Sequence, residues 1–490
     1  MSDRKKALQG SAWTIVGYGG AQVIRLGSNL VLAHLLFPAA FGVMALVGVF
    51  MQGLQMFSEV GLGPSIIQNK RGDEPDFLNT AWTIQVVRGF ILWGASCALA
   101  WPAAEYFGKT DPLAYNLLAI LPVIGFSSVL GGFASTSLYT LNRHLKIAQL
   151  TMMELIPQVI SVVVTILWAW WKRDVWALVG GWMVYSVVRL VMSHFIDRTT
   201  RNRFRWDPTA AKELVRFGLW IFLGTIVAFF ANSLDRLLLG KLLSLQDLGI
   251  YSISLTFSRV GIEVATRLSN TVLFPILAKS QDNPVKLVSK SLQARSLILL
   301  AGGALVCGFA ITAPVFFQLL YDDRYAAAGE ISRWLAIYVW CSIMLSSMER
   351  VPLALGHANS LVVANLVSTA GYALAVPAYR WYGLPGFILG NAAGSVAAHI
   401  VLLAWVPVKR WVMLGQTAAF TLAFGAYGLL AVFWVKSLEG HVTTAVSIAT
   451  AAAATALPFA VAGWLGWKQL RLLRDKPAVA TNPIPISSST

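Results

Sequence analysis

Runs of about twenty mostly apolar residues recur along the whole chain and set the first limit on its fold. A helix of this length is about 30 Å long, the thickness of the hydrocarbon core of a bilayer. Because 57% of the residues are hydrophobic and only 12% are charged, a soluble fold would need an implausibly large buried core. The sequence therefore predicts an all-α integral membrane protein. About fourteen transmembrane helices are expected, near residues 11–37, 40–61, 79–103, 113–140, 148–171, 175–196, 214–240, 246–275, 292–319, 328–354, 359–379, 384–407, 412–435 and 442–467.

Lys and Arg gather in alternate loops between these segments, as the positive-inside rule requires of cytoplasmic loops. These loops hold Arg4, Lys5 and Lys6; Lys70 and Arg71; Arg143 and Lys146; the cations of 198–216; Lys279, Lys286, Lys290 and Arg295; Lys409 and Arg410; and Lys468, Arg471, Arg474 and Lys476. The pattern predicts an even number of spans, twelve or fourteen, with both termini cytoplasmic. The net charge of +16 then follows from membrane topology and indicates no nucleic-acid partner.

An internal repeat is visible at an offset of 207 residues. "NLVLAHLLFPAAFGVMAL" (29–46) aligns with "RLLLGKLLSLQDLGIYSI" (236–253), which matches Leu30 to Leu237 and Gly42 to Gly249. Six predicted spans separate the two stretches, so both halves have the same orientation. Such parallel repeats are a transporter architecture, in which the substrate site lies between the halves.

The repeat predicts how the chain is divided. Residues 1–200 form an N-lobe of six helices and residues 201–410 a C-lobe of six helices. Residues 411–476 add two extra helices, and residues 477–490, "PAVATNPIPISSST", form a polar, disordered cytoplasmic tail. The outer loops are too short for a folded domain, so any chemistry is expected within the membrane.

Charged side chains inside the apolar segments are the strongest functional signal, because a charge at mid-bilayer costs about 2.5 to 3.5 kcal/mol on insertion scales. In 246–275, Arg259, Glu263 and Arg267 lie four residues apart on one helix face. Arg259 lies about 20 Å from the outer end of this helix. Either the ladder is internally paired and locks helix packing, or it lines a cavity with net positive charge.

Other polar residues are embedded in the apolar segments. Gln22, Arg25 and Asn29 form a stripe on the first helix, where Arg25 is a candidate cavity cation. Arg88 and Arg189 either face a cavity or extend their side chains to the cytoplasmic interface. Asp235 lies beside Arg236 nearer the outer surface. Because embedded arginines outnumber embedded acids, we expect an anionic, phosphate-bearing substrate.

Motifs for enzymatic chemistry are missing. The sequence contains no HExxH, no GxSxG and no paired-cysteine metal site, and Cys97, Cys307 and Cys341 all lie in apolar runs. We therefore expect neither an enzyme nor a bound cofactor or metal. A transporter of this kind needs a driving force, and the candidate coupling ions are H⁺ and Na⁺, with Glu263 and Asp235 as the candidate coupling residues.

The sequence also resembles a known family, the Wzx-type polysaccharide exporters of the multidrug/oligosaccharidyl-lipid/polysaccharide superfamily, particularly the colanic-acid exporter branch. The resemblance rests on "ALQGSAWT" (7–14), "FGVMALVGVFMQGLQMFSEVGLGPSIIQNK" (41–70), "LNTAWTIQ" (78–85) and "LFPILAKSQDNPVKL" (273–287). It covers residues 1 to about 410. It implies two six-helix lobes around a central cationic cavity, with two further helices.

The resemblance also implies a function. The expected substrate is an undecaprenyl-pyrophosphate-linked glycan, flipped by alternating access from the inner to the outer leaflet of a bacterial inner membrane for exopolysaccharide, capsule or O-antigen synthesis. Cavity arginines on the first and eighth helices of related lipid flippases correspond, by helix, to Arg25, Arg259 and Arg267. Membrane lipids, the polysaccharide polymerase and the export machinery are the expected partners.

Two other functions remain open from the sequence. A cation-coupled drug or metabolite antiporter of the same superfamily would favour embedded carboxylates over arginines. A membrane glycan polymerase or ligase would need a large outer loop with catalytic residues, and none is predicted.

Overall fold

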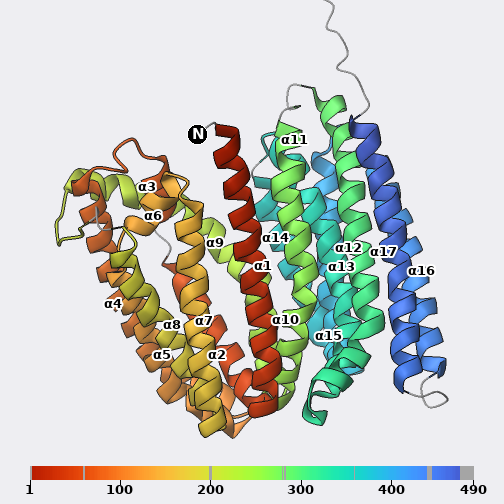
Figure 1. The fold of residues 1–490 in the computed structure, drawn as a ribbon, viewed down its shortest axis with the longest axis horizontal. Helices are drawn as coiled ribbons and strands as arrows, with labels where there is room; N and C mark the ends of the chain where they lie inside the picture. Colours follow the sequence, from red (N-terminus) through yellow and green to blue (C-terminus); the bar gives the residue numbers. More distant parts are fainter. Residues whose placement is uncertain are drawn as a thin grey trace, which may run out of the picture. The chain divides into compact units, whose positions relative to one another are not determined.

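A computed structural model describes residues 3–58, 61–197, 201–278, 280, 283–357, 359–438 and 444–474, and it confirms the all-α fold, with no strand among these residues (Figure 1). The first half contains α1 (Asp3–Leu35), α2 (Pro38–Phe57), α3 (Leu62–Gln68), α4 (Pro75–Gly108), η1 (Pro112–Asn116), α5 (Leu117–Phe133), α6 (Ser137–Arg143), α7 (Ile147–Trp171) and α8 (Trp176–Phe195). The second half contains α9 (Pro208–Leu242), α10 (Leu245–Leu268), η2 (Ser269–Leu273), α11 (Phe274–Ala278), α12 (Pro284–Leu320), η3 (Asp323–Tyr325), α13 (Ala327–Ala354), α14 (Asn359–Ala370), α15 (Tyr372–Leu402), η4 (Leu403–Trp405), α16 (Arg410–Leu438) and α17 (Thr444–Arg474). The predicted tail, 477–490, lies outside the described residues.

Ten segments of the described chain are long and apolar enough to cross a membrane. They are Pro38–Phe57, Pro75–Gly108, Pro112–Phe133, Ile147–Trp171, Trp176–Phe195, Val285–Leu320, Asp323–Ala354, Asn359–Trp405, Arg410–Ser437 and Ile448–Trp467. The protein is therefore a multi-span membrane protein. The helices α1, α9 and α10 are 33, 35 and 24 residues long but are not among the ten. The count of fourteen spans stays a prediction.

The segment Asn359–Trp405 contains the predicted boundary between the eleventh and twelfth spans. Gly383 has φ 62° and ψ −148° there, which interrupts the helical backbone of α15. Glycine adopts this conformation without the Cβ clash that other residues would have. The predicted helix break near residue 380 thus coincides with a real kink, although helical structure continues on both sides of it.

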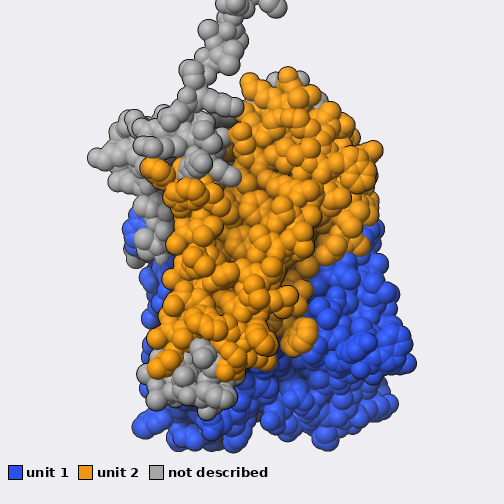
Figure 2. Space-filling model, turned by 90° about the vertical axis from the view of Figure 1, so that its right-hand side faces the viewer, with its two compact units in different colours: residues 1–257, 316–332, 365–394 blue, residues 258–315, 333–364, 395–490 orange. Residues whose placement is uncertain are grey.

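Contacts within the chain divide it into two compact units, coloured separately in Figure 2. Unit 1 contains residues 1–257, 316–332 and 365–394, and unit 2 contains residues 258–315, 333–364 and 395–490. Several long helices contribute segments to both units. The predicted lobes, 1–200 and 201–410, stay a prediction.

The internal repeat is visible in the helix ends of unit 1. The helix α1 ends at Leu35 and α9 at Leu242, while α2 begins at Pro38 and α10 at Leu245, so both boundaries recur at the offset of 207 residues. The contacts between α2 and α10 are reciprocal as well. A Cβ on Gly42 would overlap the carbonyl oxygen of Leu245, and a Cβ on Gly249 would overlap that of Pro38. The two repeats therefore meet through a symmetric close approach of backbones that only glycine permits.

Polar contacts hold the loops of unit 1 at defined positions. The helix α9 begins with Pro208 after Asp207, whose side chain accepts a hydrogen bond from the Thr209 N–H. Asp207 also pairs with Arg71 at 2.9 Å, and this hydrogen bond is the main reason that its pKa lies below the usual range. The start of α9 is thereby fastened to the turn that precedes α4.

Candidate functional site

A polar cavity of about 540 Å³ lies within unit 1, among α2, α4, α5, α6 and α8. We call it the unit 1 cavity. Arg88 of α4 and Arg189 of α8 both line it, although they are 101 positions apart in the sequence. Its other polar lining residues are Gln55, Gln85, Ser127, Ser128, Ser135, Tyr139, Trp182, Tyr185 and Ser186.

Small residues set the shape of this cavity by drawing α4 and α5 together. A Cβ on Gly89 would lie 2.6 Å from the Ser128 carbonyl oxygen, and one on Gly132 would lie 3.0 Å from that of Gln85. The buried Gln85 amide donates hydrogen bonds of 2.9 to 3.0 Å to the carbonyl oxygens of Gly131, Gly132 and Ala134, at the end of α5. The last carbonyls of a helix lack their regular i+4 partners, and here only the Gly131 carbonyl also accepts from a local N–H among the described residues, that of Ala134 at 3.2 Å. Gln85 therefore fixes both the helix end and the cavity wall.

Arg88 is oriented by the end of a neighbouring helix. Its Nε donates to Ser58 Oγ at 2.9 Å and its Nη2 to the Gln55 carbonyl oxygen at 2.8 Å, both at the C-terminus of α2. The negative end of the helix dipole lies there and favours a cation. The guanidinium is half-buried. Arg88 therefore has a structural role at α2 and, at the same time, presents positive charge to the cavity.

Arg189 belongs to a polar face of α8. Trp182, Tyr185, Ser186 and Arg189 line the cavity at spacings of three, one and three residues, which places them on one side of a helix. The Trp182 indole N–H donates to Ser127 Oγ at 3.3 Å, which ties this face to α5. This stripe is readable in the sequence, but only its arginine was among the predicted site residues.

The charged residues that line the cavity are both arginines. Its two arginines are accompanied by amides, hydroxyls and aromatic rings, and none of the lining residues in the described chain is acidic. Guanidinium groups bind phosphate oxygens in a bidentate manner, while hydroxyl and amide groups hydrogen-bond to polar hydroxyl-rich ligands. The cavity therefore suits a phosphorylated, hydroxyl-bearing ligand better than a cation.

The predicted stripe on α1 is formed but does not line this cavity. Gln22, Arg25 and Asn29 are all half-buried, and Gln22 Nε2 donates to Tyr18 Oη at 2.9 Å. The helix packs on α7, where the Gln158 amide donates to the Ala21 carbonyl oxygen at 3.0 Å. The role of Arg25 in substrate binding stays a prediction.

The Arg-Glu-Arg ladder lies on α10 as expected, in the part of that helix that belongs to unit 2. Arg259 and Glu263 are half-buried, and Arg267 is exposed. One π-helical turn, Ser269–Leu273, follows directly. Pro275 lacks the backbone N–H that a regular α-helix needs, and an extra residue in the preceding turn relieves its clash with that turn. The roles of Arg259 and Arg267 in substrate binding stay predictions.

Asp235 is buried in unit 1 rather than placed at an aqueous surface. Its Oδ2 accepts a hydrogen bond of 3.0 Å from Tyr251 Oη, and its Oδ1 lies 3.8 Å from Arg236 Nε. Burial with a hydrogen bond and a neighbouring cation is what a stable embedded carboxylate needs. Whether Asp235 or Glu263 couples to an ion stays a prediction.

Arg295 was counted among the cations of the cytoplasmic side, near the start of the predicted span 292–319, and that assignment stays a prediction. Arg295 lies on α12 inside unit 2 with 0% of its surface exposed. Its guanidinium donates to Thr417 Oγ1 at 3.0 Å, Ser347 Oγ at 3.3 Å and Gln416 Oε1 at 3.4 Å. Three neutral acceptors from two other helices replace the water that a loop residue would have had.

Residues 31–330 match the family described as "Polysaccharide biosynthesis protein", which is more than half of the chain. The chain belongs to this family.

Two curated relatives have names that refer to the biosynthesis of a bacterial polysaccharide or lipopolysaccharide. The chain is 22% identical over 331 residues to the "Lipopolysaccharide biosynthesis protein WzxC" of Escherichia coli (strain K12), across 66% of this chain and 65% of the relative. It is 22% identical over 336 residues to the "Succinoglycan biosynthesis transport protein ExoT" of Rhizobium meliloti (strain 1021), across 68% of this chain and 66% of the relative. The matched region thus spans slightly less than two thirds of each relative.

Solved structures establish the fold of this family member. The "Lipid II flippase MurJ, inward closed conformation" superposes with a TM-score of 0.69 at 14% identity, and the match covers 95% of this chain and 100% of that one. A "multidrug resistance MATE family transporter of the MOP superfamily" superposes with a TM-score of 0.61 at 15% identity, covering 80% and 96%. The chain therefore shares the overall fold of these two transporters.

The region shared with the family contains most of the candidate site. Arg88 and Arg189 of the unit 1 cavity lie within residues 31–330, as do the α10 ladder and Asp235. Gln22, Arg25 and Asn29 precede the matched region. The family match therefore includes the arginines of the unit 1 cavity. It does not include the α1 stripe, for which only the similarity of fold is available.

Proposed function

We propose that the protein is a flippase that moves polyprenyl-pyrophosphate-linked oligosaccharide repeat units from the inner to the outer leaflet of a bacterial inner membrane. The product would feed exopolysaccharide, capsule or O-antigen synthesis. The observation that carries the proposal is the acid-free unit 1 cavity with Arg88 and Arg189, in a member of a polysaccharide biosynthesis family. The names of WzxC and ExoT and the fold of a lipid II flippase support it.

The chemistry of the substrate fits this cavity. A pyrophosphate carries several negative charges that would be costly to move through the hydrocarbon core, and paired guanidinium groups reduce that cost. The hydroxyl and amide groups of Ser127, Ser186 and Gln85 suit sugar hydroxyls, while a polyprenyl chain needs only apolar lipid. Transport, rather than bond cleavage, follows from this division of roles.

The transport cycle in this proposal is alternating access, in which a substrate-bound state opens first to one side and then to the other. Arg25, Arg259 and Arg267 hold the pyrophosphate along the path. The coupling ion is H⁺ or Na⁺, with Glu263 or Asp235 as its carrier. Both termini are cytoplasmic, and the polysaccharide polymerase and export machinery take the flipped product.

The test is deletion of the gene in a strain that has no other flippase for the same glycan. The lipid-linked oligosaccharide should accumulate in the inner leaflet, out of reach of a probe confined to the periplasm, and reintroduction of the wild-type chain should restore access. Normal exposure of the glycan in the deletion strain would refute the flippase function. Accumulation of a drug or cation without any change in the glycan would instead favour an antiporter.

The arginines on α10 allow a narrower test. We expect Arg259→Gln, expressed at the wild-type level, to reduce glycan exposure by roughly tenfold, because one charge-assisted contact is worth about 1.5 to 3 kcal/mol. Arg259→Lys should retain more activity, since it keeps the charge but not the planar fork. Full export by Arg259→Gln would remove this residue from the substrate path.

A further inference from the structure

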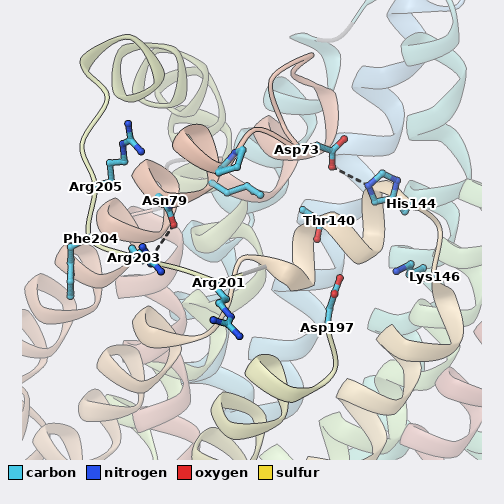
Figure 3. Close-up of a pocket in the computed structure, with 12 residues that line it drawn as sticks. Asp73, Asn79, Thr140, His144, Lys146, Asp197, Arg201, Arg203, Phe204 and Arg205 are labelled. Carbon is cyan, nitrogen blue, oxygen red and sulfur yellow. Dashed lines mark hydrogen bonds and ion pairs between the residues drawn. The ribbon is translucent and has the colours of Figure 1, made fainter. Parts of the chain in front are cut away.

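A second pocket, of about 690 Å³, lies at one end of unit 1, where three loops meet (Figure 3). It is separate from the unit 1 cavity, since the two share no lining residue. We call it the loop pocket. Its walls come from the start of α4, the α6–α7 turn, Asp197 and the segment 201–205 that precedes α9.

The loop pocket carries unneutralised positive charge. Asp73 pairs with Arg143 and His144, each at 3.0 Å, and Arg205 pairs with Asp76 at 2.8 Å. Three lining cations, Lys146, Arg201 and Arg203, have no ion pair among the described residues. The acidic lining residues are Asp73 and Asp197, and the lining Lys and Arg residues outnumber them.

The segment 201–205, which supplies Arg201 and Arg203, is held in place by hydrogen bonds of the Asn202 side chain and of the Arg203 backbone N–H. Asn202 Nδ2 donates to Thr136 Oγ1 at 2.7 Å, while its Oδ1 accepts from Ser135 Oγ at 2.9 Å. The Arg203 N–H donates to Asn79 Oδ1 at 2.8 Å. These anchors leave the side chains of Arg201 and Arg203 exposed while holding their backbone in place. The pocket is therefore built before any ligand arrives.

Aromatic residues interleave with these cations in the sequence "RNRFRW", residues 201–206. Phe204 is 65% exposed and packs on Trp82 with ring centroids 4.7 Å apart, and Trp206 is 59% exposed. Exposed aromatic rings next to cations are typical of the headgroup level of a membrane, where rings enter the interface and cations meet phosphates. A site for soluble phosphate alone would have no use for these rings.

We propose that the loop pocket binds the phosphate groups of an anionic phospholipid, with Lys146, Arg201 and Arg203 as the cationic contacts and Phe204 and Trp206 against its glycerol and acyl region. Basic pockets beside membrane helices bind lipids with phosphate headgroups in this manner. The volume and the three cations suit a headgroup with two phosphates, such as cardiolipin. This site does not depend on the transported substrate.

The experiment titrates cardiolipin onto the delipidated full-length chain in detergent and counts bound lipids by native mass spectrometry. We expect Arg201→Gln/Arg203→Gln to weaken cardiolipin binding by roughly thirtyfold, at about 1 kcal/mol per cation. Arg201→Lys/Arg203→Lys should stay within about threefold of wild type, because the charges are kept. Both positions are exposed and unpaired among the described residues, so neither variant is expected to alter folding.

The matched control is Lys172→Gln/Arg173→Gln, at the other end of α7 from Lys146. It removes the same charge from exposed positions beside aromatic residues, and it should leave cardiolipin binding unchanged. An equal loss in the control would show non-specific charge attraction and overturn the site. Equal binding of phosphatidylcholine, or displacement of cardiolipin by millimolar pyrophosphate, would overturn the choice of an anionic phospholipid.

Discussion

Arg88 and Arg295 are 207 residues apart, the offset that relates the two repeats, yet their surroundings are opposite. Arg88 is half-buried, binds the end of α2 and lines an open cavity of unit 1. Arg295 has no exposed surface and donates only to side chains inside unit 2. Two arginines on α4 and α12, separated in sequence by the repeat offset, thus have different surroundings.

The difference comes from helices that only the second half possesses. Gln416 and Thr417, two of the three acceptors of Arg295, belong to α16, which follows the second repeat. The Gln416 amide also donates to the Leu292 carbonyl oxygen at 2.8 Å, so α16 is fastened directly beside Arg295. An added helix therefore encloses Arg295, whereas Arg88 lines the unit 1 cavity.

The largest expected effect is the loss of the buried arginine. Arg295→Ala should lower the free energy of unfolding by about 4 kcal/mol, because it leaves a large void between α12, α13 and α16. Arg88→Ala should cost only about 1.5 kcal/mol, since it removes two hydrogen bonds at a partly hydrated site. Denaturant unfolding of the detergent-solubilised chain measures both. Equal losses would mean that the two positions are not as different as their burial indicates.

The next largest effect concerns the close backbone contact that the two repeats make through Gly42 and Gly249. Gly42→Ala and Gly249→Ala should each destabilise the chain by about 3 kcal/mol, because the new Cβ must push apart two closely packed backbones. The two losses should be similar, since the contact is reciprocal. Gly48→Ala on the same helix as Gly42 is the control, because a Cβ there meets nothing within 4 Å. If Gly249→Ala were tolerated while Gly42→Ala destabilised the chain, the two backbone contacts would not be energetically equivalent.

The third prediction separates function from packing in the unit 1 cavity. Arg189→Gln should reduce glycan exposure by roughly tenfold, about 1.4 kcal/mol, while the free energy of unfolding changes by less than about 0.5 kcal/mol. Arg189 is exposed to the cavity, so its charge acts on a ligand more than on the fold. Lys172→Gln, an exposed cation outside the cavity, is the control for charge. Normal export by Arg189→Gln would remove Arg189 from the substrate path.

Much of this arrangement could be predicted from the sequence, and the reason is periodicity. Apolar runs gave the all-α membrane fold, and Leu and Gly matches gave an offset that the helix ends at Leu35 and Leu242 reproduce. Arg88 and Arg189 were identifiable because an arginine inside an apolar run is costly wherever it lies. These features depend on residues close together in the sequence or on simple repetition.

Other features depend on contacts between distant segments, which the sequence does not reveal. Arg295 lies near the start of an apolar run and has the pattern of a loop cation, but its burial depends on Thr417, 122 residues later. The polar lining of the unit 1 cavity likewise joins five helices. The loop pocket needs Asn202 to reach Thr136 across 66 residues. Composition and spacing alone contain none of this information.

The repeats are also joined by a pair of reciprocal contacts at their corners, both within unit 1. Asp111, after α4, accepts a hydrogen bond of 2.9 Å from the Leu245 N–H at the α9–α10 corner. After α12, Arg324 and Tyr325 donate to the His34 and Leu36 carbonyl oxygens at the α1–α2 corner. The second contact differs from the first because it depends on an ion pair, in which Asp322 holds Arg324 through two hydrogen bonds of 2.9 and 3.1 Å.

The smallest expected effect is the pH dependence of the Asp322–Arg324 ion pair, which only the second corner contact contains. The hydrogen bonds from Arg324 lower the pKa of Asp322 to about 2, so its stabilising contribution is complete above the ordinary carboxyl pKa of about 4 and is lost as the pH falls from about 4 to about 2. The pair is partly exposed and screened by water, so the loss should stay below about 1 kcal/mol. Asp322→Asn should be less stable than wild type at pH 6 and should converge with it near pH 2, when apparent unfolding temperatures are compared across this range. A constant difference between the two proteins from pH 6 to pH 2 would show that the side chain acts through its shape, because charge loss alone would remove the difference.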